Sequence, residues 1–231
     1  MDRTRSAVVL ASLALIVALP PAAAQVAPSA AEVAAFGVLH AAAYRGDLNA
    51  LRAALAQGQP VNQRGAHGRT PLHVATFARQ RDAIRELAAA GADLGALEND
   101  RYDAVTIAAV ADDEQTLALL LSLGASAGLT TSRYDGTALI AAAHLGHDGV
   151  VRRLIKAGAP LNHVNNLHWT AAIEAVVLGD GGPRHQEVHA ALLRAGASTA
   201  LADRSGRTPL QIARDRGHGA MVRMLEGAGA R

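Results

Sequence analysis

Residues 68–93 read GRTPLHVATFARQRDAIRELAAAGAD, and they predict two short helices joined by a turn. Thr70 is a good N-cap, because its hydroxyl can accept a hydrogen bond from a free amide in the first turn. Pro71 then occupies the first helical position, where its missing N–H has no consequence. We expect this first helix to run to about Ala78.

The second helix is expected from about Arg81 to Ala90, with Ile84 and Leu87 on its inner face. Gly91 ends it, because a glycine just past a helix can adopt the left-handed conformation. The residues that follow lead into an extended loop, called a finger below, which runs to the next pair of helices.

The same pattern recurs along the chain. Six glycines close successive units at intervals of 33, 33, 34, 38 and 33 residues: Gly58, Gly91, Gly124, Gly158, Gly196 and Gly229. An early apolar position keeps step with them: Leu39, Leu72, Val105, Leu139, Ala172 and Leu210. Capping residues recur too: Thr70, Asp103, Thr137, Thr170 and Thr208. Such units bury their apolar faces only against their neighbours, which predicts an all-α repeat solenoid.

These phrases resemble the ankyrin repeat. Residues 70–75, TPLHVA, match its helix-opening signature, and residues 208–213, TPLQIA, nearly do. The resemblance covers residues 36–231 and implies six stacked helix-turn-helix units, of which the first and last are degenerate. It also implies a concave surface of fingers and first helices that binds another protein, and no catalytic activity.

The first 24 residues are expected to be a secretory signal of the bacterial type. Arg3 and Arg5 precede an apolar run over residues 7–19, and small residues at 22–24 offer a cleavage site. The alternative is an uncleaved anchor, but the run is shorter than the ~20 residues that a span needs. We therefore expect a periplasmic protein, with residues 25–35 as a segment that precedes the repeats.

Composition narrows the partners. The chain has no cysteine, so stability must come from packing. Without the signal it carries 20 basic and 19 acidic side chains, a balance that argues against nucleic acid. No later apolar run is long enough to cross a membrane. We expect a monomer that binds a protein partner and uses no cofactor.

The residue just before each helix cap defines a candidate binding stripe. This position carries Arg69, Tyr102, Gly136, Trp169 and Arg207, and Tyr134 lies two residues before Gly136. Because tryptophan, tyrosine and arginine are enriched at binding hot spots, we hypothesise that the five large side chains contact the partner. The alternative is that the aromatic rings pack against neighbouring fingers.

The longest interval marks a second candidate region. Five extra residues lie between the helices of the fifth unit, and the glycine-rich text from 178 to 185 predicts a loop. It is either a tolerated insertion or a second contact site. His185 and His189 share one helical face, with Asp180 upstream, so a metal or small-ligand site is the alternative function. Two histidines alone make a weak site.

An enzyme is the third alternative. The chain has no Gly-x-Ser-x-Gly motif, and its acidic residues form no pair that can be assigned to acid–base catalysis. A buried carboxylate hydrogen-bonded to a base in a cleft would be needed to support this alternative.

Overall fold

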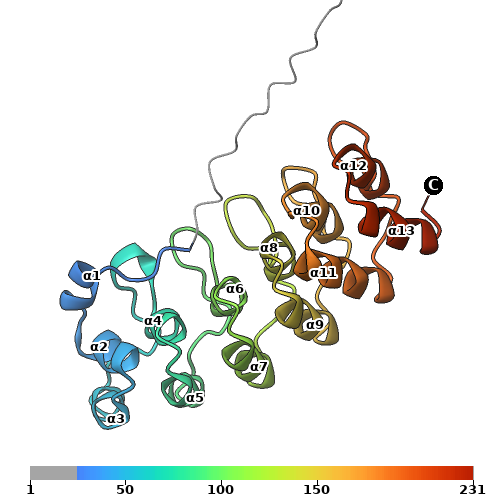
Figure 1. The fold of residues 1–231 in the computed structure, drawn as a ribbon. Helices are drawn as coiled ribbons and strands as arrows, with labels where there is room; N and C mark the ends of the chain where they lie inside the picture. The colour runs from blue at the N-terminus through green and yellow to red at the C-terminus, as the bar shows by residue number, and fades with distance from the viewer. Residues whose placement is uncertain (1–24, 231) are drawn as a thin grey trace, which may run out of the picture.

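Six pairs of antiparallel helices stack side by side in the computed structural model, which describes residues 25–230 (Figure 1). A short helix, α1 (Ala30–Ala34), precedes them. The pairs are α2 (Val38–Arg45) with α3 (Leu48–Ala56), α4 (Pro71–Phe77) with α5 (Arg81–Ala89), α6 (Ala104–Val110) with α7 (Glu114–Ser122), α8 (Ala138–Leu145) with α9 (Asp148–Lys156), α10 (Ala171–Val177) with α11 (Pro183–Arg194), and α12 (Pro209–Asp215) with α13 (Gly219–Gly227).

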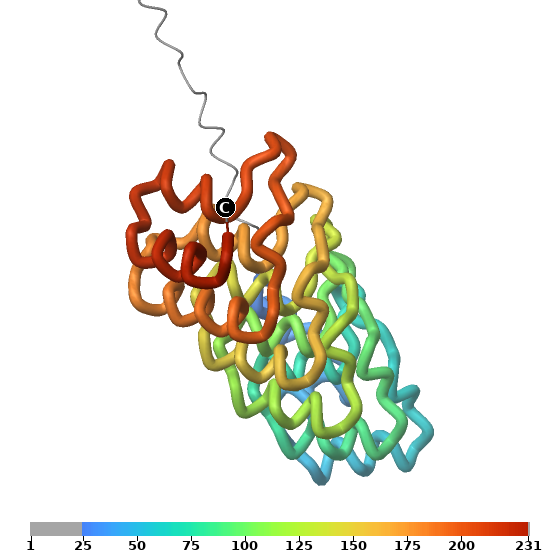
Figure 2. Tube along the Cα trace, turned by 90° about the vertical axis from the view of Figure 1, so that its right-hand side faces the viewer, coloured from blue at the N-terminus to red at the C-terminus, as the bar shows by residue number. Residues whose placement is uncertain are grey.

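The fingers lie along one edge of the stack, the first helices of the pairs in the middle, and the second helices along the other edge (Figure 1). From the C-terminal end, successive repeats follow one behind another (Figure 2). The surface made by the fingers and first helices is called the finger face below. Within residues 25–230 no strand forms, apart from one isolated bridge between Thr131 and Gly136.

The predicted helix boundaries are confirmed by their capping contacts. All five predicted caps accept a hydrogen bond from the backbone N–H three residues on: Thr70, Asp103, Thr137, Thr170 and Thr208. Gly37 stands at the corresponding position of the first unit and supplies no side-chain cap. The six closing glycines all have positive φ, from 80° to 96°, which is why glycine recurs there.

The core is an apolar layer between the helices and consists of two clusters, one that extends from the first repeat into the fifth and one in the last two repeats. The predicted apolar positions are all at most 1% exposed: Leu39, Leu72, Val105, Leu139, Ala172 and Leu210. Ile84 and Leu87 of the second helix are fully buried as well. Small alanines beside them let the helices approach closely, which explains the alanine-rich composition.

The insertion in the fifth unit differs from the prediction. Only residues 178–182 form a loop, whereas Pro183, Arg184 and His185 belong to the first turn of α11, which has 12 residues against nine in the other second helices. The cause is Pro183 at the first helical position, which favours helix initiation although glycines precede it.

The predicted signal, residues 1–24, lies outside the described residues. In the part of the chain that the structure describes, no helix has the length and apolar character to span a bilayer.

Candidate functional site

The stripe residues fall into two groups. Tyr102, Tyr134 and Trp169 are half-buried, and the Arg207 side chain is 49% exposed, so these four can reach a partner. Burial, helped by the charge of Asp100, raises the pKa of the Tyr102 hydroxyl above its ordinary value. That hydroxyl therefore stays protonated at neutral pH and can donate a hydrogen bond.

Arg69 corrects the expected stripe. It is only 5% exposed, and its Nη1 donates to both Glu32 carboxylate oxygens at 2.9 and 3.0 Å. Its other terminal nitrogen donates to the backbone carbonyl of Val26, and its guanidinium lies 4.8 Å from the centre of the Phe77 ring. Arg69 thus holds residues 26–34 against the finger between α3 and α4, to which it belongs, and is not open to a partner.

Trp169 is partly packed and partly exposed, so contact with a partner and packing within the stack are both open to its ring. Its ring packs against the core of the last two repeats, which includes Ile173 and Leu210, yet it keeps part of its surface exposed. Removing the ring would therefore lower stability as well as reduce contact area.

Three of the fingers are braced by one side chain each. In each of them an oxygen of the residue that opens the turn at the finger tip accepts two backbone N–H groups of that turn, at 2.8–3.2 Å; these residues are Glu98, Asn165 and Asp203. In each case one of the two donors is the stripe residue itself. The stripe backbone is therefore held in place from beneath, by side chains that are at most 8% exposed.

Neighbouring fingers are joined to one another. Ser132 N–H donates to the Arg101 carbonyl, and Asn166 N–H donates to the Tyr134 carbonyl, both at 2.9 Å. Arg101 pairs with Asp135 and Arg133 pairs with Asp100, each at 2.8 Å. Exposed pairs of this kind add little stability, but with the backbone bonds they fix the relative positions of the fingers.

The finger that carries Tyr134 contains the extra residue of the 34-residue interval. In the other fingers, the backbone N–H of the residue that opens the tip turn donates to the carbonyl of the residue four positions on. In this finger the Thr131 N–H donates to the Gly136 carbonyl, five positions on. Buried Gly136 thus occupies the stripe position, and Tyr134 lies in the turn at the finger tip, half-buried.

The three metal candidates do not form one site, because only Asp180 and His185 meet. His189 is fully buried in α11, where burial lowers the pKa of its ring to about 4. Both ring nitrogens of His185 are engaged within the protein: Nδ1 with Asp180 Oδ1 at 2.9 Å and Nε2 with the His144 carbonyl at 3.0 Å. Among residues 25–230, no three His, Asp or Glu side chains are grouped so that they could hold a metal ion.

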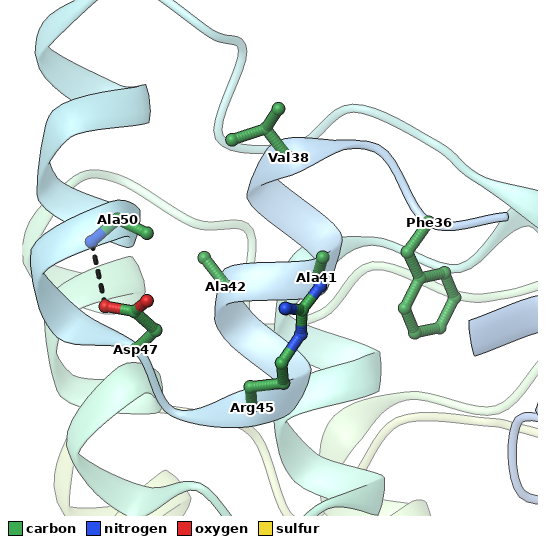
Figure 3. Close-up of a pocket in the computed structure, with 7 residues that line it drawn as sticks. All are labelled: Phe36, Val38, Ala41, Ala42, Arg45, Asp47 and Ala50. Atoms are coloured by element: carbon green, nitrogen blue, oxygen red, sulfur yellow. Dashed lines mark hydrogen bonds between the residues drawn. The ribbon is translucent and has the colours of Figure 1, made fainter. Parts of the chain in front are cut away.

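A shallow cavity of about 290 Å³ lies at the N-terminal end of the stack (Figure 3). It is lined mainly by α2 and the start of α3: Phe36, Val38, Ala41, Ala42, Arg45, Asp47 and Ala50. The Asp47 carboxylate accepts from the Ala50 N–H at 3.0 Å and so caps α3. The cavity is an end surface of mixed polar and apolar character, and its one carboxylate already caps α3.

Sequence reasoning missed one pair on the finger face. Glu174 of α10 is 4% exposed, and its Oε2 lies 3.5 Å from Nδ1 of His144 on α8. The signal was present, because Glu174 stands five positions after the stripe, where the other repeats carry apolar residues or alanine. The two side chains form an ion pair at most, since no hydrogen bond joins them.

The comparisons with known proteins agree with this architecture. A family model for ankyrin repeats, described as three copies, matches residues 30–98 and 105–203. The ankyrin repeat protein YahD of Escherichia coli K12 is 33% identical over 190 residues, which cover 82% of this chain and 94% of YahD. The chain belongs to the ankyrin repeat family.

Solved structures give the same result. An ankyrin repeat domain from Acinetobacter baumannii is 43% identical, with a TM-score of 0.79 over 84% of this chain and 98% of that one. The ankyrin repeat domain of Bcl-3 is 27% identical, with a TM-score of 0.76 over 85% and 88% of the two chains. Ankyrin repeat domains are in general protein-interaction modules and typically not enzymes.

Proposed function

We propose that this chain is exported to the periplasm, where it binds another protein through its finger face without a chemical step. Tyr102, Tyr134, Trp169 and Arg207 supply the contacts, and bound proteins are protected or inhibited by occupation of their surface. The observation that carries the proposal is the row of half-buried aromatic side chains on fingers that are locked to one another. Rigid aromatic anchors lose little entropy on binding.

The family relationship supports a protein partner, and the charged, basic-then-apolar start of the sequence supports export. The near balance of acidic and basic side chains favours a protein over nucleic acid. We expect the stack to act as a monomer, since each end repeat needs only its inner neighbour to bury its core.

The test is affinity capture from a periplasmic extract with the native protein and with a Tyr102→Ala/Tyr134→Ala double variant. We choose these tyrosines over Trp169 because they do not belong to the core clusters. Arg85→Ala on α5, a 60% exposed side chain at the opposite edge, is the matched control. Capture of the same protein by the native chain and the control, with loss in the double variant, is the expected result. Equal capture by all three would refute the finger face as the binding surface.

A further inference from the structure

One carboxylate on the finger face is buried without being satisfied. Glu174 Oε1 accepts a hydrogen bond from Asn165 Nδ2 at 3.2 Å. Oε2 is buried and has no hydrogen-bond partner, and the His144 ring lies beside it, with Nδ1 3.5 Å away. Among the described residues, no arginine or lysine pairs with Glu174.

Packing does not require a carboxylate at this place. The equivalent positions of the other five repeats are Ala41, Val74, Ile107, Ala141 and Ile212. Val74, Ile107 and Ile212 are at most 2% exposed, so the position is ordinarily a core position. A buried ionised group with an unpartnered oxygen destabilises a fold, and a native protein that keeps one needs a further reason.

The surroundings place Glu174 next to the proposed binding stripe. Asn165, its donor, opens the turn that ends at Trp169, and Asn165 Oδ1 accepts a hydrogen bond from the Trp169 N–H at 2.9 Å. His144 comes from the last turn of the neighbouring first helix, α8, and its side chain is 31% exposed. A partly exposed imidazole beside a buried carboxylate oxygen can turn aside without disturbing the core.

The irregular loop of the fifth repeat supports this arrangement from behind. The Asp180 carboxylate holds the His185 ring, and that ring in turn bonds the backbone carbonyl of His144. Gly179 lies so close to α10 that a Cβ there would stand 2.1 Å from the Ala175 carbonyl. The extra residues therefore fix the end of α8, and with it the side chain that faces Glu174.

We propose that Glu174, with Asn165 and His144, forms a pocket for a cationic side chain, arginine or lysine, of a protein partner. A guanidinium or ammonium group would donate a hydrogen bond to Oε2 and supply the positive charge that balances the carboxylate. Such an interaction is stronger than a neutral hydrogen bond. The inference rests on the proposed function and deepens it, because it gives the partner a basic residue opposite the contact between α8 and α10.

The test uses a defined probe in place of the partner: N-acetyl-arginine amide, with N-acetyl-glutamine amide as the neutral comparison. Each is titrated into the 15N-labelled native protein, and amide chemical shifts are followed by NMR. The arginine probe is expected to give saturable shifts in residues 142–145 and 165–175, and the glutamine probe none there. Shifts absent from these residues, or equal for both probes, would overturn the pocket.

Two variants sharpen the result. Glu174→Gln keeps an oxygen for Asn165 but removes the charge, so the arginine probe should bind about tenfold more weakly or worse. Glu187→Gln, an exposed carboxylate on α11, removes the same charge elsewhere and should leave binding unchanged. Equal weakening in both variants would assign the effect to net charge and overturn the pocket.

The native titration does not depend on whether the Glu174 variant folds, so the inference stays testable in either case. Because no natural partner is involved, failure here leaves the capture experiment with the tyrosine variant unaffected, and the two proposals can fail separately.

Discussion

His189 is a core position where we expect a substitution to raise the free energy of unfolding, whereas most core substitutions lower it. Its side chain is fully buried in α11, and neither ring nitrogen has a hydrogen-bond partner. Replacing it with leucine, which is similar in size, removes two unsatisfied polar atoms and keeps most of the packing. Relieving a buried unsatisfied polar group is worth about 1–3 kcal/mol, so His189→Leu should raise the free energy of unfolding at pH 7.

The effect grows in acid, and its sign follows from linkage. Burial lowers the pKa of His189 to about 4 in the folded protein, against about 6.5 in the unfolded chain. The native state therefore disfavours the proton, and the stability present above pH 6.5 is lost as the pH falls toward 4. At pH 5 this one residue lowers the free energy of unfolding by about 2 kcal/mol. His189→Leu should abolish that share of the loss.

Denaturant unfolding of the native and variant proteins at pH 7 and pH 5 measures both effects. His73 has a similarly lowered pKa of about 4, again chiefly from burial, and stays in both proteins. The difference between them therefore isolates His189. A variant that is less stable than the native protein at pH 7, or that loses as much stability at pH 5, would refute the reasoning.

Two further predictions concern the contact between Glu32 and Arg69 and the close approach of Gly179 to Ala175. Glu32→Ala leaves Arg69 without its carboxylate, so residues 30–36 should undock, and their amides should exchange with solvent at least about tenfold faster, whereas Glu187→Ala should not change them. Unchanged exchange would show that Arg69 does not hold this segment. Gly179→Ala should lower stability by about 1–3 kcal/mol because its Cβ meets the Ala175 carbonyl, while Gly227→Ala, with open space around it, should be neutral or stabilising; similar values for both would contradict the close contact at Gly179.

The sequence was sufficient for everything that is local and periodic. Thr70, Thr137 and Gly91 act at fixed distances from the helix ends they satisfy, so their roles follow from spacing alone. The 34-residue interval likewise identifies the unit with one extra residue, because one unit can be compared with the next.

Contacts between distant residues could not be read in this way. Arg69 and Trp169 occupy equivalent positions, but Arg69 is buried because Glu32, which lies outside the repeating pattern, reaches it. The burial of Glu174 depends on Asn165 and His144, which approach it from a finger and from the neighbouring repeat. The boundary at Pro183 differs from the predicted loop over residues 178–185 by three residues. Pro183 starts α11 although the surrounding glycines favour a loop.

The most direct test of the binding proposal is a hydrogen-exchange footprint of the complex with a captured partner. The account predicts slowed exchange in the fingers over residues 98–102, 131–136 and 165–169, and in the end of α8. The second helices α5, α7 and α9 should exchange as in the free protein. Protection confined to those second helices, with the fingers unchanged, would contradict recognition through the finger face.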